Sequence, residues 1–324
     1  MSAWSPLRYR VYRVMWIALL ASNVGTWMQA VGAAWLMVEL DASPAIVALV
    51  QTATYLPTVV VGVAAGAAAD LVERRRLLLI TQGSMLIAAA GLTVLAALDA
   101  VTPTLLLTFT FALGLGATFN FPAWQAIQPD LVPPRELKQA VTLGGANLNI
   151  GRAIGPAVGG LLIAAAGAWL VFALNAASFA FVLTVLWRWK RPVEEDPGPA
   201  EHFAGAVRAG IRYAMFSHNL HGVLVRSFAF GVASAGFMSL LPVYASQELG
   251  WGSGGLGILF AAMGVGAVTT AAVIPSIRKR LSADGVFAVG SALVAAGLLA
   301  LAALHEPVAA VAVSFMIGLG WLFC

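Results

Sequence analysis

The stretch Gly66-Ala67-Ala68-Ala69-Asp70-Leu71-Val72-Glu73-Arg74-Arg75-Arg76 decides the fold of this chain. It separates two apolar runs, 46–69 and 77–98. Each run is long enough to cross a bilayer as a helix, because about 20 residues span roughly 30 Å of hydrocarbon. A short charged loop between two such helices is a tight turn at one membrane face. Its consecutive arginines place that face in the cytoplasm, where Lys and Arg are retained.

The composition indicates a polytopic membrane protein. The chain has 324 residues, of which 60% are hydrophobic and only 10% are charged. A soluble domain carries about 25% charged residues. The net charge of +4 is explained by cytoplasmic loops and does not predict a nucleic-acid partner. The single cysteine, Cys324, excludes a disulfide framework and a cysteine-based metal site, and we expect no cofactor.

The hydropathy pattern predicts an all-α fold with ten membrane-spanning helices. Short connections and abundant Gly and Ala favour close packing between these helices. The expected spans are 14–38, 46–69, 77–98, 104–126, 138–165, 168–189, 219–245, 253–275, 284–304 and 307–324.

Charged residues divide the loops into two alternating sets. Acidic loops without Lys or Arg contain Glu39, Asp41, Asp99, Glu248 and Glu306. The other loops, apart from a neutral turn at 166–167, carry basic residues, namely 74–76, 135, 138, 188–191 and 278–280. The positive-inside rule therefore predicts a multi-pass protein of the cell (inner) membrane with a cytoplasmic N-terminus.

A long polar segment divides the chain into two bundles. We expect an N-terminal six-helix bundle at 1–190, a cytoplasmic linker at 191–217 and a second bundle of four helices at 218–324. A shift that carries Arg74 onto Arg278 also carries Pro103 onto Pro307, which indicates a parallel repeat. Transporters built from such repeats hold their substrate between the halves, near the bilayer midplane.

The loop after the second span resembles the signature of the major facilitator superfamily, G-x-x-x-D-[RK]-x-G-R-[RK]. Gly66, Asp70, Arg74 and Arg75 match this pattern, whereas Leu71 and Glu73 depart from it. The resemblance implies two six-helix bundles and a gating role for the matching residues.

The fifth span resembles the antiporter motif of that superfamily, G-x-x-x-G-P-x-x-G-G. Glycines at such spacing let another helix approach closely, and a proline favours a bend. The resemblance implies export rather than uptake and a conformational role for Gly151, Gly155, Pro156, Gly159 and Gly160.

The amino-acid sequence resembles one branch of the superfamily, the transmembrane secretion effectors, which include exporters like the enterobactin exporter. The stretches that carry this similarity are 35–40, 120–127, 130–133 and 149–156. It implies a monomeric secondary transporter that secretes a siderophore, drug or metabolite by proton antiport and alternating access. An importer and an inactive fragment remain alternatives. Because the second repeat stops after its fourth helix, we expect the family's helix eleven to be missing and Asp70 to be held only by Arg74, Arg75 or Arg76.

Polar residues inside the spans mark a candidate substrate site. Arg152 lies mid-span, where a charge is costly unless it is paired or hydrated. Three interpretations are open. Arg152 anchors an anionic group of the substrate, it forms a gating ion pair across the cavity, or it is a packing arginine whose donors are satisfied by carbonyls and by Asn149 or Asn175. Amide and aromatic groups in other spans suit an amphipathic substrate, although interhelical hydrogen bonding explains them equally well. The residues expected to contact substrate are Asn23, Trp27, Gln51, Tyr55, Asn120, Trp124, Asn149 and Arg152.

Two further absences bear on mechanism. Thr110 stands four residues before Gly114, where many drug–proton antiporters have arginine, and no carboxylate lies in the middle of a span. Proton coupling therefore has no evident carrier. The histidines lie in loops or at helix ends, and no hydrolase or phosphate-loop motif is present, so we expect no enzymatic activity.

Overall fold

The computed structural model describes residues 4–189, 215–277 and 281–323, together with positions 205, 208 and 212. Nine of the helices in these ranges are long and apolar enough to cross a membrane, and a tenth, at 307–321, is shorter. The predicted all-α polytopic fold is confirmed, and each of the ten predicted spans corresponds to a helix. The helices are α1 (Arg10–Glu39), α2 (Pro44–Leu71), α3 (Arg74–Ala97), α4 (Pro103–Ala126), α6 (Leu137–Ala166), α7 (Ala168–Arg188), α9 (His218–Val243), α10 (Ser253–Ile277), α11 (Ala283–Ala303) and α12 (Pro307–Trp321).

Short helical pieces join some of the long helices. They are η1 (Ser5–Arg8), α5 (Gln128–Leu131), η2 (Pro134–Glu136) and the π-helical turn η3 (Tyr244–Glu248). The predicted basic corner at 278–280 and most of the predicted linker at 191–217 lie outside the described residues.

Local sequence signals fix the helix ends. Pro44, Pro103 and Pro307 each stand in the first turn of a helix, where a missing N–H costs nothing. The Glu73 carboxylate caps α3 by accepting hydrogen bonds from the backbone N–H groups of Arg75 and Arg76, at 3.0 and 2.6 Å. The signature loop is therefore a helix start as well as a turn.

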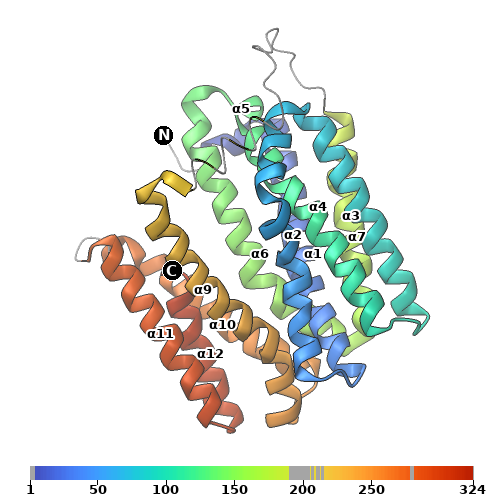
Figure 1. Cartoon of the computed structure of the whole chain (residues 1–324), viewed down its shortest axis with the longest axis vertical. Coiled ribbons are helices and arrows are strands. Elements are labelled where there is room, and N and C mark those ends of the chain that lie inside the picture. Colours follow the sequence, from blue (N-terminus) through green and yellow to red (C-terminus); the bar gives the residue numbers. More distant parts are fainter. Residues whose placement is uncertain are drawn as a thin grey trace.

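The helices are arranged as two halves (Figure 1). The first half contains α1 to α7, in which α1 packs on α6 and α7, α2 on α4, and α3 on α4 and α7. In the second half, α10 packs on α12 and α12 on α11. Within the described residues, α6 packs along α10, and α9 packs on α2 and, less extensively, on α1, so these pairs connect the halves.

The apolar cores are distributed unevenly along the bundle. One cluster of buried side chains includes residues of both halves, among them Trp35 and Val50 from the first and Phe237 and Leu256 from the second. A second cluster, around Met15, belongs to the first half alone. The halves therefore share a core that extends from the helix ends near Glu39 and Glu248 to Met263 on α10 and Trp321 on α12.

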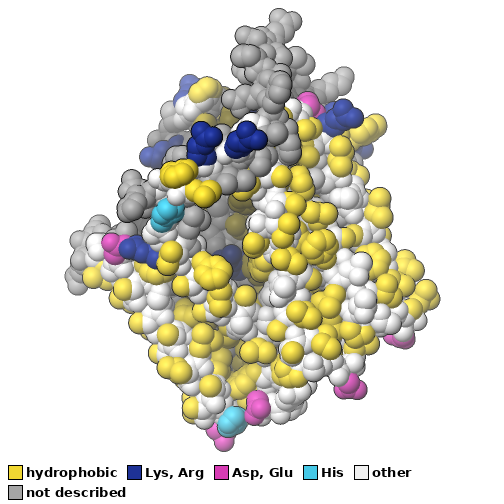
Figure 2. Space-filling view, viewed as in Figure 1, with side chains coloured by type: hydrophobic (Ala, Val, Ile, Leu, Met, Phe, Trp, Pro, Cys, Tyr) yellow, Lys and Arg dark blue, Asp and Glu magenta, His cyan; other side chains and the backbone are white. Residues whose placement is uncertain are grey.

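Charged side chains mark the two ends of the bundle. Figure 2 shows Lys and Arg side chains near one end, whereas the opposite end is marked by acidic side chains and a histidine. We call the end that carries Arg74–Arg76 the basic end and the end that carries Glu39, Asp99 and Glu248 the acidic end. The separation has the form that the positive-inside rule predicts for a protein with its basic end in the cytoplasm.

The orientation is testable on the two turns that flank α3. Val72 lies in an exposed turn at the basic end, and Ala100 lies in an exposed turn at the acidic end. In a Cys324→Ser background, we expect a membrane-impermeant maleimide to label Ala100→Cys on intact cells. Val72→Cys should be labelled only after permeabilisation. Labelling of Val72→Cys alone on intact cells would contradict a cytoplasmic basic end.

Candidate functional site

The glycine-rich face of α6 is divided between two partner helices. Gly151, Gly155 and Gly159 face α1: a Cβ on Gly155 would lie 2.5 Å from the Cβ of Trp27, and one on Gly159 would lie 3.0 Å from the Cα of Met28. Such separations are below ordinary van der Waals contact, so these glycines let α6 and α1 pack backbone to side chain. Three of the five motif residues therefore pack within the first half.

Gly160 faces the second half instead. A Cβ at Gly160 would lie 2.5 Å from the Cα of Gly257 on α10, and one at Gly264, further along α10, would lie 2.6 Å from the carbonyl oxygen of Ala153. These contacts are between backbones, which flexible side chains do not relieve. The line along which α6 and α10 meet is therefore built for close approach between the halves.

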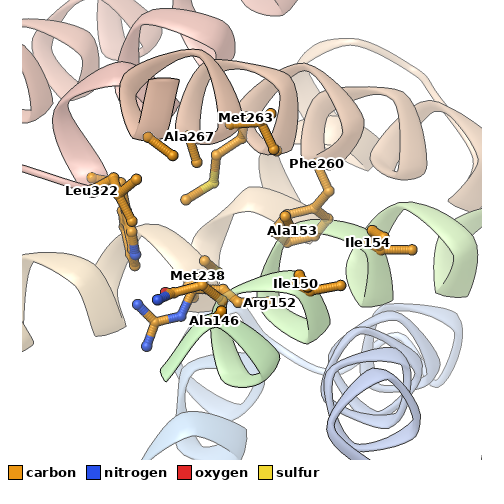
Figure 3. A pocket seen from close by; sticks show the side chains of 15 residues that line it. Ala146, Ile150, Arg152, Ala153, Ile154, Met238, Phe260, Met263, Ala267 and Leu322 are labelled. Atoms are coloured by element: carbon orange, nitrogen blue, oxygen red, sulfur yellow. The ribbon is translucent and has the colours of Figure 1, made fainter. Parts of the chain in front are cut away.

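A cavity of about 310 Å³ lies between the halves, beside this contact. Side chains of α6, α9, α10 and α12 line it (Figure 3). Most of the lining is apolar, including Met238, Phe260 and Met263. The polar lining side chains are Asn149, Arg152 and the indole of Trp321. This composition, apolar walls with a few polar groups, is typical of sites for small organic molecules.

Among the described residues that line the cavity, Arg152 is the charged one. Its guanidinium carbon lies 5.2 Å from the centroid of the Trp27 ring, within cation–π range. Its buried Nε has no hydrogen-bond partner in the part of the chain that the structure describes. In Figure 3 the side chain extends away from α6, toward the side of the cavity on which Leu322 lies. Arg152 thus lines the cavity and carries one buried donor, Nε, without a partner.

The neighbours of Arg152 do not neutralise it. Tyr55 on α2 is close enough to interact electrostatically with the guanidinium, and half of its side chain is exposed (50%). Asn149 donates to the carbonyl of Gly145 at 3.0 Å, and Asn175 donates to Gln29. The packing interpretation requires a hydrogen bond from Arg152 to Asn149 or Asn175. No such hydrogen bond is present among the described residues. No described ion pair involves Arg152 either.

The other predicted contacts are spread over the first half. Asn23 donates to the Oδ1 of Asn147 at 2.8 Å, beside the α1–α6 contact. Asn120 faces α3, where its Oδ1 accepts hydrogen bonds from Thr81 and Gln82, both at 3.2 Å. Two more, Gln51 and Trp124, are not among the residues that line the cavity, and Trp124 is buried in the core of the first half. Of the eight predicted residues, Asn149 and Arg152 line the cavity, Trp27 and Tyr55 lie beside the Arg152 side chain, and the rest lie elsewhere.

The arginines of the signature loop hold helix ends. Arg74 donates to the carbonyl oxygen of Ala126 at 3.0 Å and lies 3.9 Å from the carboxylate of Asp130. Arg75 donates to the carbonyl oxygens of Leu186 and Trp187, at 2.9 and 2.8 Å. The C-terminal carbonyls of α4 and α7 have no partner within their own helices, so cations there are favourable.

The prediction that Asp70 is held by these arginines is wrong. Its side chain is exposed and makes no ion pair within the described residues. The reason is that Arg74 and Arg75 extend to α4 and α7, whose ends are close in space although distant in sequence.

Comparison with known protein families places the chain. The sequence model of the transmembrane secretion effectors, a branch of the major facilitator superfamily, matches residues 1–324. The chain belongs to this family. It is therefore a membrane transporter of the facilitator type and not an enzyme, as the sequence predicted.

Two curated relatives are also transporters by name. The staphyloferrin A transporter of Staphylococcus aureus is 24% identical over 277 residues, which cover 85% of this chain and 70% of that protein. The enterobactin exporter EntS of Salmonella typhi is 29% identical over 225 residues, which cover 67% of this chain and 52% of the relative. The chain thus spans only about half the length of the exporter that it matches.

Solved structures share the fold of this secretion effector. The nucleoside transporter NupG superposes with a TM-score of 0.75 at 13% identity, covering 97% of this chain and 80% of that one. A bacterial homolog of the human lysosomal transporter Spinster superposes with a TM-score of 0.67 at 16% identity, covering 98% of this chain and 75% of that one.

Two features of the second half escaped the sequence analysis. Arg226 on α9 pairs with Asp284, which lies in the first turn of α11, at 2.5 Å, and both side chains are exposed. Trp321 lines the cavity with a buried indole. An aromatic residue near the end of a span is usually read as an interfacial anchor, so its position alone gave no signal.

Proposed function

We propose that this secretion effector exports a small amphipathic organic anion through the cavity between its halves, by alternating access. Arg152 carries the proposal, because it is a cation in a mostly apolar cavity, its Nε has no partner and it has no described counter-charge. An unpaired charge at this depth is expensive, and a substrate anion would compensate it. Arg152, Asn149, Trp27 and Tyr55 are the proposed binding residues.

The position of the cavity supports loading from the basic end. The shared core includes Trp35 and Val50 near the acidic end as well as the cavity-lining Phe260, Met263 and Trp321, and the cavity continues from there along α10 to Ala271, toward the basic end. With the basic end in the cytoplasm, a substrate would enter from the cytoplasm and leave at the acidic end. This direction agrees with the printed name of the enterobactin exporter, and a siderophore, drug or metabolite is the proposed cargo.

Proton antiport is the proposed coupling, although the energetics do not demand it. A cytoplasm at negative potential already favours the outward movement of an anion, by about 2.3 kcal/mol per 100 mV for each charge. The described carboxylates lie at helix ends, as Glu39 and Asp70 illustrate, so a proton carrier within a span is not evident. A proton gradient and a membrane potential must therefore be applied separately.

Transport by inverted membrane vesicles tests this function. We expect saturable uptake of radiolabelled aromatic monoanions and siderophores into inverted vesicles that contain the 324-residue chain. Nigericin should reduce uptake that is driven by a proton gradient, whereas valinomycin with potassium should reduce uptake driven by the potential. Accumulation by intact cells instead would indicate an importer. No transport in either direction by correctly inserted protein would contradict the proposal.

A further inference from the structure

Trp321 lines the cavity from the opposite half and carries a second buried donor without a partner. Its side chain is 6% exposed, and its indole Nε1 has no hydrogen-bond partner among the described residues. Two rings hold the indole, because the centroid of Phe230 lies 5.4 Å away in an edge-to-face arrangement and that of Phe237 lies 6.1 Å away. The indole is thus fixed in place with a free N–H.

A buried N–H without an acceptor is unfavourable by about 1–3 kcal/mol. Nε of Arg152 and Nε1 of Trp321 have almost no surface open to water, so water does not replace the missing acceptor. The cavity therefore holds two orphaned donors, Nε of Arg152 on α6 and Nε1 of Trp321 on α12. The side-chain oxygen of Asn149 is an acceptor in the same lining, yet neither donor uses it.

We infer that Trp321 donates a hydrogen bond to a second, neutral acceptor on the anion that Arg152 anchors. This inference rests on the proposed function and specifies its substrate: a monoanion whose apolar body carries one further carbonyl or ether oxygen. A second full charge has no partner, because Arg152 supplies the cation among the described lining residues. Met238, Phe260 and Met263 suit a flat, polarisable body.

The arrangement also connects binding with conformation. Arg152 belongs to the first half and Trp321 to the second, so a ligand that accepts from both donors ties α6 to α12. Such a ligand binds best in the state in which the donors are correctly spaced, and it shifts the population toward that state. A ligand that has the anionic group alone does not contact Trp321, so it does not favour one conformation in this way.

Matched probes separate the two donors. Benzoate carries only the anionic group, acetophenone only the neutral acceptor, and para-acetylbenzoate both, with acetylnaphthoate as a longer homologue. Binding is measured by equilibrium dialysis of radiolabelled probes against the full chain in lipid nanodiscs. Trp321→Phe keeps an aromatic ring, smaller than the indole, and removes the N–H. We expect it to weaken binding of an acetyl-bearing anion about tenfold and to leave benzoate unchanged, the effect of losing one buried hydrogen bond.

The controls distinguish failure of this inference from failure of the proposed function. Phe230→Leu loosens the packing around the indole but keeps its N–H, so it should change all anionic probes alike. Arg152→Gln should weaken benzoate and the acetyl-bearing anions together. If Trp321→Phe leaves every probe unchanged, or weakens benzoate as much as the acetyl-bearing anions, Trp321 is only a packing residue and the inference is overturned. If Arg152→Gln changes none of the probes, or if no anion binds the unaltered protein, the anion site itself is wrong and the inference falls with it.

Discussion

Arg152→Ala is expected to lower the transport of organic anions at least about 100-fold while the protein still inserts into the membrane. A charge-assisted hydrogen bond is worth roughly 1.5–3 kcal/mol, and the Coulomb attraction inside a mostly apolar cavity adds to it. Arg152→Lys should keep part of the activity, because lysine retains the charge and the attraction to the Trp27 ring but loses the fixed fork of donors. The measurement is initial uptake into inverted vesicles, normalised to inserted protein.

Stability should change in the opposite direction. Removing a partly buried charge that has no described counter-charge relieves a desolvation cost, so Arg152→Leu is expected to raise the apparent melting temperature of the empty protein in detergent. A merely structural arginine would behave differently, since its loss would reduce both transport and stability.

Arg226→Ala is the matched control for a lost arginine. Arg226 is exposed and pairs with the exposed Asp284, and surface ion pairs contribute only about 0–1 kcal/mol. We expect this variant to retain most of its transport. Full activity of Arg152→Ala, or an equal loss in Arg152→Ala and Arg226→Ala, would remove Arg152 from the substrate site.

The helices were predictable because their signal is local. About 20 consecutive apolar residues are sufficient to identify a span, and the prolines at 44, 103 and 307 mark where helices begin. Arg152 was predictable for the same reason, since a charge in the middle of an apolar run stands out without knowledge of its neighbours.

Partners of side chains were not predictable, because they come from distant parts of the chain. Asp70 and Arg74 are neighbours in sequence, yet Arg74 contacts the end of α4, some 50 residues away, where helix carbonyls lack partners. Asn120 was expected to contact substrate, but Thr81 and Gln82 on α3 occupy its side-chain oxygen. The position of Trp321 at the cavity depends on how α12 packs beside α6, α9 and α10, which the sequence around Trp321 does not indicate.

The glycine motif of α6 contains one feature that was predictable from the sequence and one that was not. Its spacing predicted close helix approach, and that approach is present at every glycine of the motif. The spacing did not predict which helix each glycine contacts. Gly151, Gly155 and Gly159 pack on α1 in the same half, and only Gly160 meets α10 across the interface. The gating role that the resemblance implies for all of them is therefore proposed here chiefly for Gly160.

Gly160→Val is expected to be the most damaging substitution on α6. A Cβ at this position would lie 2.5 Å from the Cα of Gly257 and 2.8 Å from the carbonyl oxygen of Ser253, both backbone atoms. Because neither contact is relieved by a rotamer change, α6 and α10 must separate. Overpacking of this kind costs about 1–3 kcal/mol, and the two halves lose the close contact on which alternating access depends. We expect a lower apparent melting temperature and at least a tenfold loss of transport.

Gly145→Val is the matched control, since it makes the same chemical change on the same helix at a position where an added Cβ meets no atom within 4 Å. Valine has the same helix propensity at both positions. The difference in stability and transport between the two variants therefore measures the effect of the contact with α10. Gly155→Val, which would force Trp27 and α1 away, should destabilise the first half instead. Double substitution of Gly155 and Gly160 should then be close to additive in stability, because the two glycines contact different helices. If Gly160→Val is as stable and as active as Gly145→Val, the α6–α10 contact is not needed for transport, and the gating role must be assigned elsewhere.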